Sequence, residues 1–178
     1  ILIALLVIIV ITFISYFNRF VVLGNRIDNS LSQIDVQLRK RADLVPNLMN
    51  TVKGYVKHEK EIFKQLTDAR KAIMGAGDIT TRMKAGNKLQ AALKTIFAMA
   101  ESNPELKANE NFLQLQQELA AIEDKIAYSR QFYNDSILDY NNSVKTFPGT
   151  FFASIFNKRE KPFLQIPEAA RAVPKVEF

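Results

Sequence analysis

The sequence predicts an all-α protein: an N-terminal transmembrane helix continuing into a long kinked helix, an antiparallel up-and-down bundle of three to four helices, and an extended C-terminal tail. Two observations predict this class. The chain opens with an apolar run long enough to cross a bilayer, and apolar residues then recur at steps of three and four, without an alternating strand pattern. We therefore divide the chain into an anchor over residues 1–23, a bundle over residues 24–146 and a Phe- and Pro-rich tail over residues 147–178.

The anchor has no charge over residues 1–17, and its full length of about 23 residues makes a helix of roughly 34 Å. A cleaved signal peptide is the alternative, but the run lacks the small-residue cleavage site of such peptides. Because the chain begins without Met, we expect further residues before Ile1. The nearest basic residues, Arg19, Arg26 and Arg39 to Arg41, come after the uncharged part of the span and favour a cytoplasmic bundle, although lysines before Ile1 would reverse this orientation.

The longest helical pattern runs from Ile27 to Ile73. Its core-facing positions are Ile27, Leu31, Ile34, Leu38, Arg41, Val45, Leu48, Val52, Tyr55, Glu59, Ile62, Leu66, Ala69 and Ile73. Pro46 cannot donate to the carbonyl of Ala42, so the helix kinks or ends there. The pattern keeps its phase across Pro46, which favours a kinked continuous helix; a true turn would add one more helix. The charge of Arg41 either pairs with another helix or extends outward along the bundle, and the second is commoner for isolated charges.

Two further helices complete the predicted bundle. Gly75 and Gly77 supply a left-handed residue to end the long helix, and Asp78 caps the next one. That second helix has Leu89, Leu93, Ile96 and Ala100 on its apolar face. Asn103 then serves as the N-cap of a third helix, with Pro104 at its first position. Its apolar positions are Phe112, Leu115, Leu119, Ile122, Ile126, Ser129, Tyr133, Ile137, Tyr140 and Val144, ahead of a stop at Pro148 and Gly149.

The tail holds four of the six prolines and six phenylalanines, so we expect extended chain with one or two helical turns. Its most suggestive feature is a set of rings at helical spacing followed by Lys158, Arg159 and Lys161. These rings are Phe147, Phe151, Phe152 and Phe156. They either dock on a membrane surface or a neighbouring subunit, or cover the flank of the chain's own bundle, the commoner arrangement.

No catalytic arrangement is recognisable. The chain has no cysteine, and its one histidine, His58, lacks the second histidine of an HExxH zinc motif. We therefore predict no enzyme activity, no catalytic residue, no metal and no cofactor. The net charge of +6 is spread among acidic residues, with Arg39 to Arg41 the only tight basic cluster. Membrane lipid is thus a simpler partner than nucleic acid, for which no recognition motif is present.

Several motifs resemble those of the LemA family of bacterial membrane-anchored proteins. They are the run RIDNSLSQIDVQLRKRADLVPNL from Arg26, TVKGYVKHE from Thr51, NPELKAN from Asn103, and the pairs Tyr133-Asn134, Tyr140-Asn141 and Phe147-Pro148. Ser30-Leu31 departs from the Ala-Trp frequent in the family, but the leucine keeps the apolar pattern. The resemblance covers nearly the whole chain and implies a single-pass anchor with a soluble helical bundle. It implies no reaction, and it hints at envelope maintenance or stress.

We interpret the polar motif residues of the long helix as an interface. They are Asp35, Arg39, Arg41, Asp43, Asn47 and His58, beside the kink at Pro46. Polar residues are denser here than a solvated helix requires, which favours a non-enzymatic scaffold that forms a homo-oligomer at the bacterial inner membrane. The alternative is an adaptor that presents clients or another membrane protein to an envelope protease.

Overall fold

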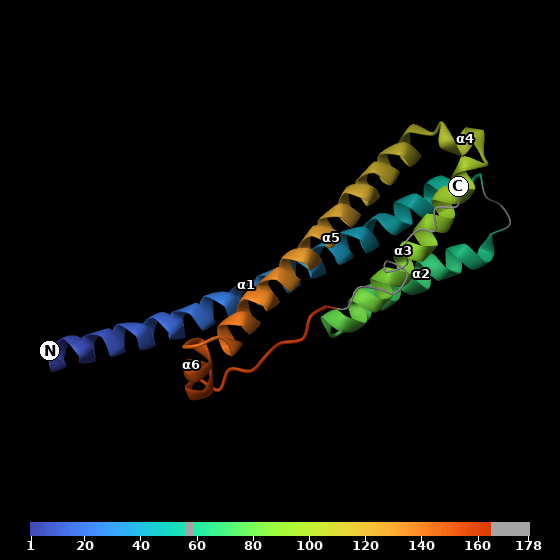
Figure 1. Cartoon of the computed structure of the whole chain (residues 1–178). Coiled ribbons are helices and arrows are strands. Elements are labelled where there is room, and N and C mark those ends of the chain that lie inside the picture. Colours follow the sequence, from blue (N-terminus) through green and yellow to red (C-terminus); the bar gives the residue numbers. More distant parts are fainter. Residues whose placement is uncertain (56–58, 165–178) are drawn as a thin grey trace, which may run out of the picture. The chain divides into compact units, whose positions relative to one another are not determined.

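The computed structural model describes residues 1–55 and 59–164, and these residues are helical with turns and extended chain but no strand. The helices are α1 (Leu2–Val52), α2 (Lys60–Gly75), α3 (Ile79–Glu101), α4 (Pro104–Lys107), α5 (Glu110–Lys145) and α6 (Gly149–Ile155) (Figure 1). The predicted all-α class is confirmed, as is the continuous helix that leads from the apolar segment into the bundle. Two predicted features, His58 and residues 165–178 of the tail, lie outside the described residues.

The chain divides into two compact units. One contains Ile1–Ser30 together with the described residues from Arg130 onward, and the other contains Leu31–Ser129. We call them the anchor unit and the bundle unit, and we describe each by itself. Both α1 and α5 contribute to both units.

The first helix does not end at the proline. Pro46 lies inside α1, which continues to Val52, so the turn considered at this position does not form. The helix ends six residues later instead. The Tyr55 amide donates to the Val52 carbonyl at 2.9 Å, and the Tyr55 hydroxyl accepts from Asn109 Nδ2 at 3.2 Å. The bundle unit thus ties the end of α1 to the start of α5.

The prediction of one helix from Ile27 to Ile73 is therefore wrong beyond Val52. Val52 before the break and Ile62 after it are both buried. The apolar pattern therefore keeps its phase even though the helix ends between them. Periodicity reports which face of a segment is buried, and it does not report whether the chain runs straight between two segments. Glu59, which the pattern placed on the core face, is an exposed residue at the N-cap of α2.

The bundle unit is an up-and-down arrangement, as predicted. The later part of α1, then α2, α3 and the first part of α5 alternate in direction along the chain (Figure 1). Its buried apolar residues come from all four of these helices. They include Ile34, Leu38, Val45, Leu48, Leu66, Ile73, Leu89, Leu93, Ile96, Phe112, Leu119 and Ile126. Burial of this shared apolar core stabilises helices that are too amphipathic to be stable alone in water.

In the α2–α3 connection, the predicted start of α3 is confirmed and the predicted way of ending α2 is not. The Asp78 side chain accepts from the Thr81 amide at 2.8 Å and begins α3, as expected for an N-cap. No glycine among the described residues has a positive φ, so the left-handed stop predicted at Gly75 and Gly77 is wrong. The carbonyls at the end of α2 are taken by an arginine side chain instead.

The cap gives a pH-dependent prediction. The hydrogen bonds from Thr81 lower the pKa of Asp78, so the stability that the ionised cap contributes is present above about pH 4 and is lost as the pH falls through the lowered pKa. The Asp78→Asn variant keeps an acceptor oxygen but does not titrate. Thermal melts at pH 7 and pH 3 should therefore show a smaller drop in Tm for Asp78→Asn than for the unmodified chain. Equal drops would contradict this assignment.

Candidate functional site

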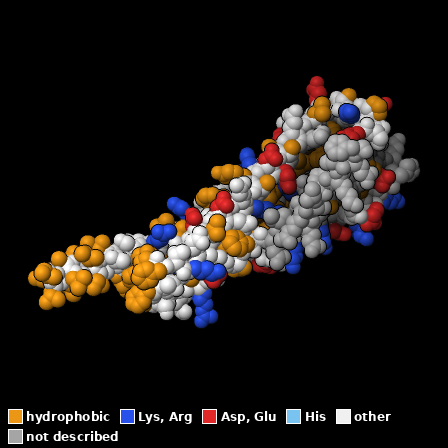
Figure 2. All heavy atoms as spheres, in the orientation of Figure 1, with side chains coloured by type: hydrophobic (Ala, Val, Ile, Leu, Met, Phe, Trp, Pro, Cys, Tyr) orange, Lys and Arg blue, Asp and Glu red, His pale blue; other side chains and the backbone are white. Residues whose placement is uncertain are grey.

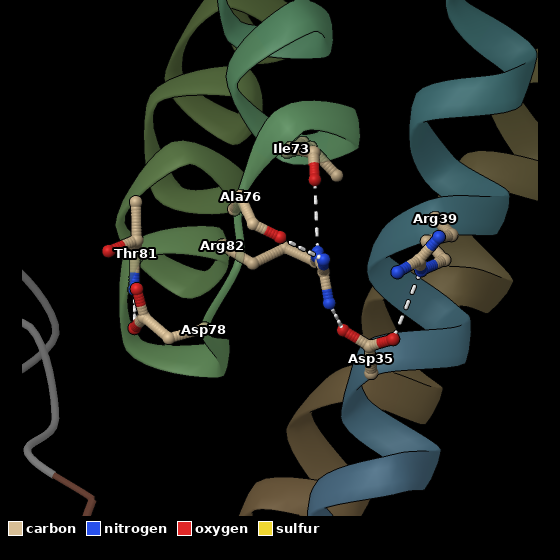
Figure 3. A network of polar contacts seen from close by, with 7 residues as sticks. All are labelled: Asp35, Arg39, Ile73, Ala76, Asp78, Thr81 and Arg82. Carbon is tan, nitrogen blue, oxygen red and sulfur yellow. Dashed lines mark hydrogen bonds and ion pairs between the residues drawn. The ribbon is translucent and has the colours of Figure 1, made fainter.

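The middle of α1 carries a polar network that joins it to the other helices of the bundle unit. Its centre is Arg82 of α3, whose side chain is almost fully buried. Arg82 Nε donates to the Ile73 carbonyl at 2.9 Å, one Nη donates to the Ala76 carbonyl, and the other pairs with the Asp35 carboxylate (Figure 3). Arg82 thereby completes the end of α2 and fixes it to α1.

Asp35 is shared between two arginines. Its second carboxylate oxygen accepts from Arg39 Nε at 3.0 Å, one turn along the same helix. An exposed pair of this kind contributes little alone, but here it orients a carboxylate that also holds Arg82. Of the predicted interface residues, Asp35 is therefore engaged inside the chain, and the Arg39 side chain remains 46% exposed.

The second connection is a buried ion pair between α1 and α5. Arg41 is 2% exposed, and its Nη2 pairs with Glu123 Oε2. Burial lowers the pKa of Arg41 to about 10, so the guanidinium stays charged at neutral pH. Sequence reasoning considered this pairing but ranked the outward orientation higher, because it could not identify Glu123 as the partner.

The third connection satisfies the carbonyl that the proline leaves without a donor. Pro46 has no N–H, and the Ala42 carbonyl one turn earlier instead accepts from Arg70 Nε of α2 at 3.1 Å. The helix thus passes through a proline because a side chain from its neighbour replaces the missing backbone bond. Sequence reasoning placed Pro46 on the helix but did not single out Arg70.

This replacement predicts an energetic coupling between the two positions. Arg70→Met should cost about 1 kcal/mol when Pro46 is present, because it leaves the Ala42 carbonyl without a donor. In a Pro46→Ala background, where residue 46 regains its N–H, the same change should cost clearly less. Urea unfolding of the four chains measures the coupling as a double-mutant cycle. Strictly additive effects would mean that Arg70 does not serve this carbonyl.

The remaining predicted interface residues lie on the surface of α1. Asp43 and Asn47 are exposed, as is Lys40. Together with Arg39 they form what we call the polar stripe, defined as Arg39, Lys40, Asp43 and Asn47. Its members follow at helical spacing, with two basic residues one turn before an acidic one.

Three residues of the network were missed by sequence reasoning: Arg70, Arg82 and Glu123. A signal existed for Arg82, because it lies seven residues before Leu89 and so continues the apolar face of α3 with a charge. A charge in phase with a core face has to find a partner when it is buried. Glu123 gave no such signal, because it lies beside the apolar face of α5 and is not part of it.

The anchor unit contains a second polar arrangement, in which two asparagines of α5 hold the tail. The Asn141 side chain accepts from the Lys161 amide and donates to the Lys161 carbonyl, both at 2.9 Å. Asn134 makes the same pair of bonds with Leu164, at 2.9 and 3.4 Å. Seven helical residues advance about 10.5 Å and three extended ones about 10 Å, so the two spacings match. The segment up to Leu164 is therefore attached along α5.

The four tail rings separate into two sets. Phe152 is buried and Phe156 is largely covered, whereas Phe147 and Phe151 are exposed. All four lie at or beside α6, where helical turns were expected.

The described part of the chain has no group of three or more His, Asp or Glu side chains that could hold a metal ion.

Comparison with known proteins gives the family. The model described as the LemA family matches residues 30–178, a range that includes the polar network and both asparagines. The chain belongs to the LemA family. The resemblance predicted from the motifs is thereby confirmed.

Three relatives of this LemA-family chain carry two different names. It is 25% identical over 183 residues to the magnetosome protein MamQ of Magnetospirillum gryphiswaldense, covering 88% of this chain and 67% of the relative. It is also 25% identical over 124 residues to protein LemA of Metamycoplasma hominis, covering 69% and 57%. A MamQ 2 protein of Paramagnetospirillum magneticum is 23% identical over 180 residues, covering 86% and 66%. The chain thus spans about two thirds or less of these relatives.

Proposed function

We propose that this LemA-family chain is a non-enzymatic, membrane-anchored scaffold of the bacterial inner membrane whose copies associate side by side through the polar stripe of α1. The first part of α1 is long and apolar enough to cross a membrane, and its side chains are largely exposed. Arg19 and Arg26 follow the apolar segment, which favours a cytoplasmic bundle unit. An envelope role in organisation or stress belongs to the same proposal.

The observation that carries self-association is the polar stripe itself. The network inside the bundle unit uses Asp35 and Arg41, and it leaves Lys40, Asp43 and Asn47 exposed on the same helix. Basic residues one turn from an acidic one make a self-complementary surface, since the bases of one copy can face the acid of the next. Val36, 44% exposed, adds an apolar contact on the same side of α1.

Light scattering of the full chain in a mild detergent tests this proposal. We expect a mass of at least two copies of the 20.2 kDa chain. The Asp43→Lys variant leaves the polar stripe with basic charges and no acidic one, and it should shift the protein toward monomers. Asp68→Lys is the matched control, because it makes the same charge change at an exposed position of α2 and should leave the mass unchanged.

A monomeric mass for the unmodified chain at micromolar concentration would contradict the proposal of self-association. The same measurement bears on the adaptor role, in which the exposed stripe binds a different membrane protein or a protease. Cross-linking from Asn47 in native membranes would then capture that protein instead of a second copy.

A further inference from the structure

The short helix α6 has two aromatic sides, and one of them packs on α1. Phe152 stacks on Tyr16 with ring centroids 4.7 Å apart, and Phe156 meets Phe13 edge-on at 4.9 Å and Phe17 at 5.4 Å. These contacts bury Phe152 to 8% exposure. The inner side of α6 is thereby fixed against the apolar segment of α1.

The other side of α6 is uncovered. Phe151 and Ile155 of α6 are 61% and 51% exposed, and Phe147, in the turn just before α6, is 87% exposed. We call these three residues the outer row. Figure 2 shows hydrophobic side chains gathered over this part of the anchor unit, with basic side chains beside them. A cluster of exposed rings costs free energy in water, so an apolar surface should cover it.

The level of α6 along α1 identifies that surface. Its rings contact α1 between Phe13 and Phe20, and the first charge of the chain, Arg19, lies within this range. Arg19 Nε donates to Ser143 Oγ at 2.9 Å, so this charge is directed toward α5. The end of an uncharged apolar run marks where a spanning helix leaves the hydrocarbon core. The uncharged run ends at Asn18, so α6, whose rings contact Phe13 to Phe20, lies at the level where this run ends.

The position of α6 is held from both ends. At its start, Gly149 lies so close to the Ser143 carbonyl that an added Cβ would overlap it. Beyond its end, the paired bonds between Asn141 and Lys161 attach the following chain to α5. Both restraints hold α6 in a position in which the outer row is exposed.

We propose that α6 is an interfacial membrane helix whose outer row inserts into the lipid leaflet in which α1 ends. Lys158 and Arg159, immediately after α6, would then meet anionic headgroups. This inference rests on membrane anchoring by α1 in the proposed function and adds a second lipid contact. That contact sets the depth of α1 and its rotation in the bilayer, because α6 projects from one side of α1 only.

Tryptophan fluorescence tests the insertion, since the chain has no tryptophan of its own. The full-length Phe151→Trp variant is reconstituted into vesicles of phosphatidylcholine and phosphatidylglycerol, with or without bromine on the acyl chains. We expect a blue-shifted emission, loss of most of the signal with brominated lipid, and protection from aqueous acrylamide. The control is Phe132→Trp on α5, a residue 42% exposed, which brominated lipid should not quench.

Flotation of the vesicles distinguishes a failure of membrane anchoring by α1 from a failure of insertion by α6. A Phe151→Trp chain that does not float with the vesicles would overturn membrane anchoring and the present inference together. A chain that floats but is quenched by acrylamide and not by brominated lipid would overturn the inference and leave the anchor intact. Protection from both quenchers in floating vesicles would also overturn it, because a second copy of the chain would then cover the outer row.

Discussion

Replacing Arg82 with Met should cost about 3 kcal/mol of unfolding free energy, because it leaves two carbonyls at the end of α2 without their donor and leaves the Asp35 carboxylate with Arg39 as its remaining partner. Arg82 is 7% exposed, so water cannot easily take its place. Urea unfolding of the full chain in detergent measures the loss.

Two companion variants make this expectation specific. Arg82→Lys keeps the charge but lacks the planar fork that reaches three acceptors, and we expect it to recover less than half of the loss. Lys84→Met removes a basic residue from an exposed position of the same helix and should be nearly neutral. If Arg82→Met were as mild as Lys84→Met, the network would not hold α2, α3 and α1 together.

The buried pair between α1 and α5 should respond asymmetrically to mutation. Glu123→Ala leaves Arg41 charged, with its side chain 3% exposed, and should cost about 3 kcal/mol. Arg41→Met leaves Glu123, which is 40% exposed and can turn to water, and should cost about 1 kcal/mol or less. The double variant should resemble Arg41→Met alone.

Urea unfolding of the three variants decides this order. The difference between the two single variants comes from burial and not from the number of charges removed, since each of them removes one. An Arg41→Met variant more costly than Glu123→Ala would contradict it. Such a result would mean that Arg41 contributes mainly through the packing of its stem.

The sequence was most informative where structure is local. Asp78 and Asn103 were recognised as caps because an N-cap needs only a side-chain oxygen and the next turn. The apolar faces around Leu89 and Leu119 followed from periodicity. The continuation of α1 through Pro46 also followed, although the reason it is tolerated did not.

Contacts between distant segments could not be predicted in the same way. Arg70 reaches Ala42 across 28 positions, and Arg82 reaches Asp35 across 47. Such partners depend on how helices pack, which one sequence does not specify. The break after Val52 was missed for the same reason, because the turn is held by Asn103 and Asn109 from another segment.

The structure also leaves fewer residues available for the predicted interface. Pattern reasoning grouped Asp35 and Arg41 with Asp43 and Asn47, since all four are polar positions on one helix. Burial separates them: Arg41 is inside the bundle unit, Asp35 is bonded to Arg82, and Asp43 and Asn47 face outward. The proposal of self-association therefore now rests on the polar stripe.

Disulfide cross-linking in membranes tests self-association most directly, because the chain contains no cysteine and a single one can be introduced cleanly. An Asn47→Cys chain in membrane vesicles should give a dimer of about twice 20.2 kDa on mild oxidation. Asp68→Cys, at an exposed position on α2, should give far less dimer under the same conditions. Equal and low yields of dimer from Asn47→Cys and Asp68→Cys would contradict side-by-side association through the polar stripe.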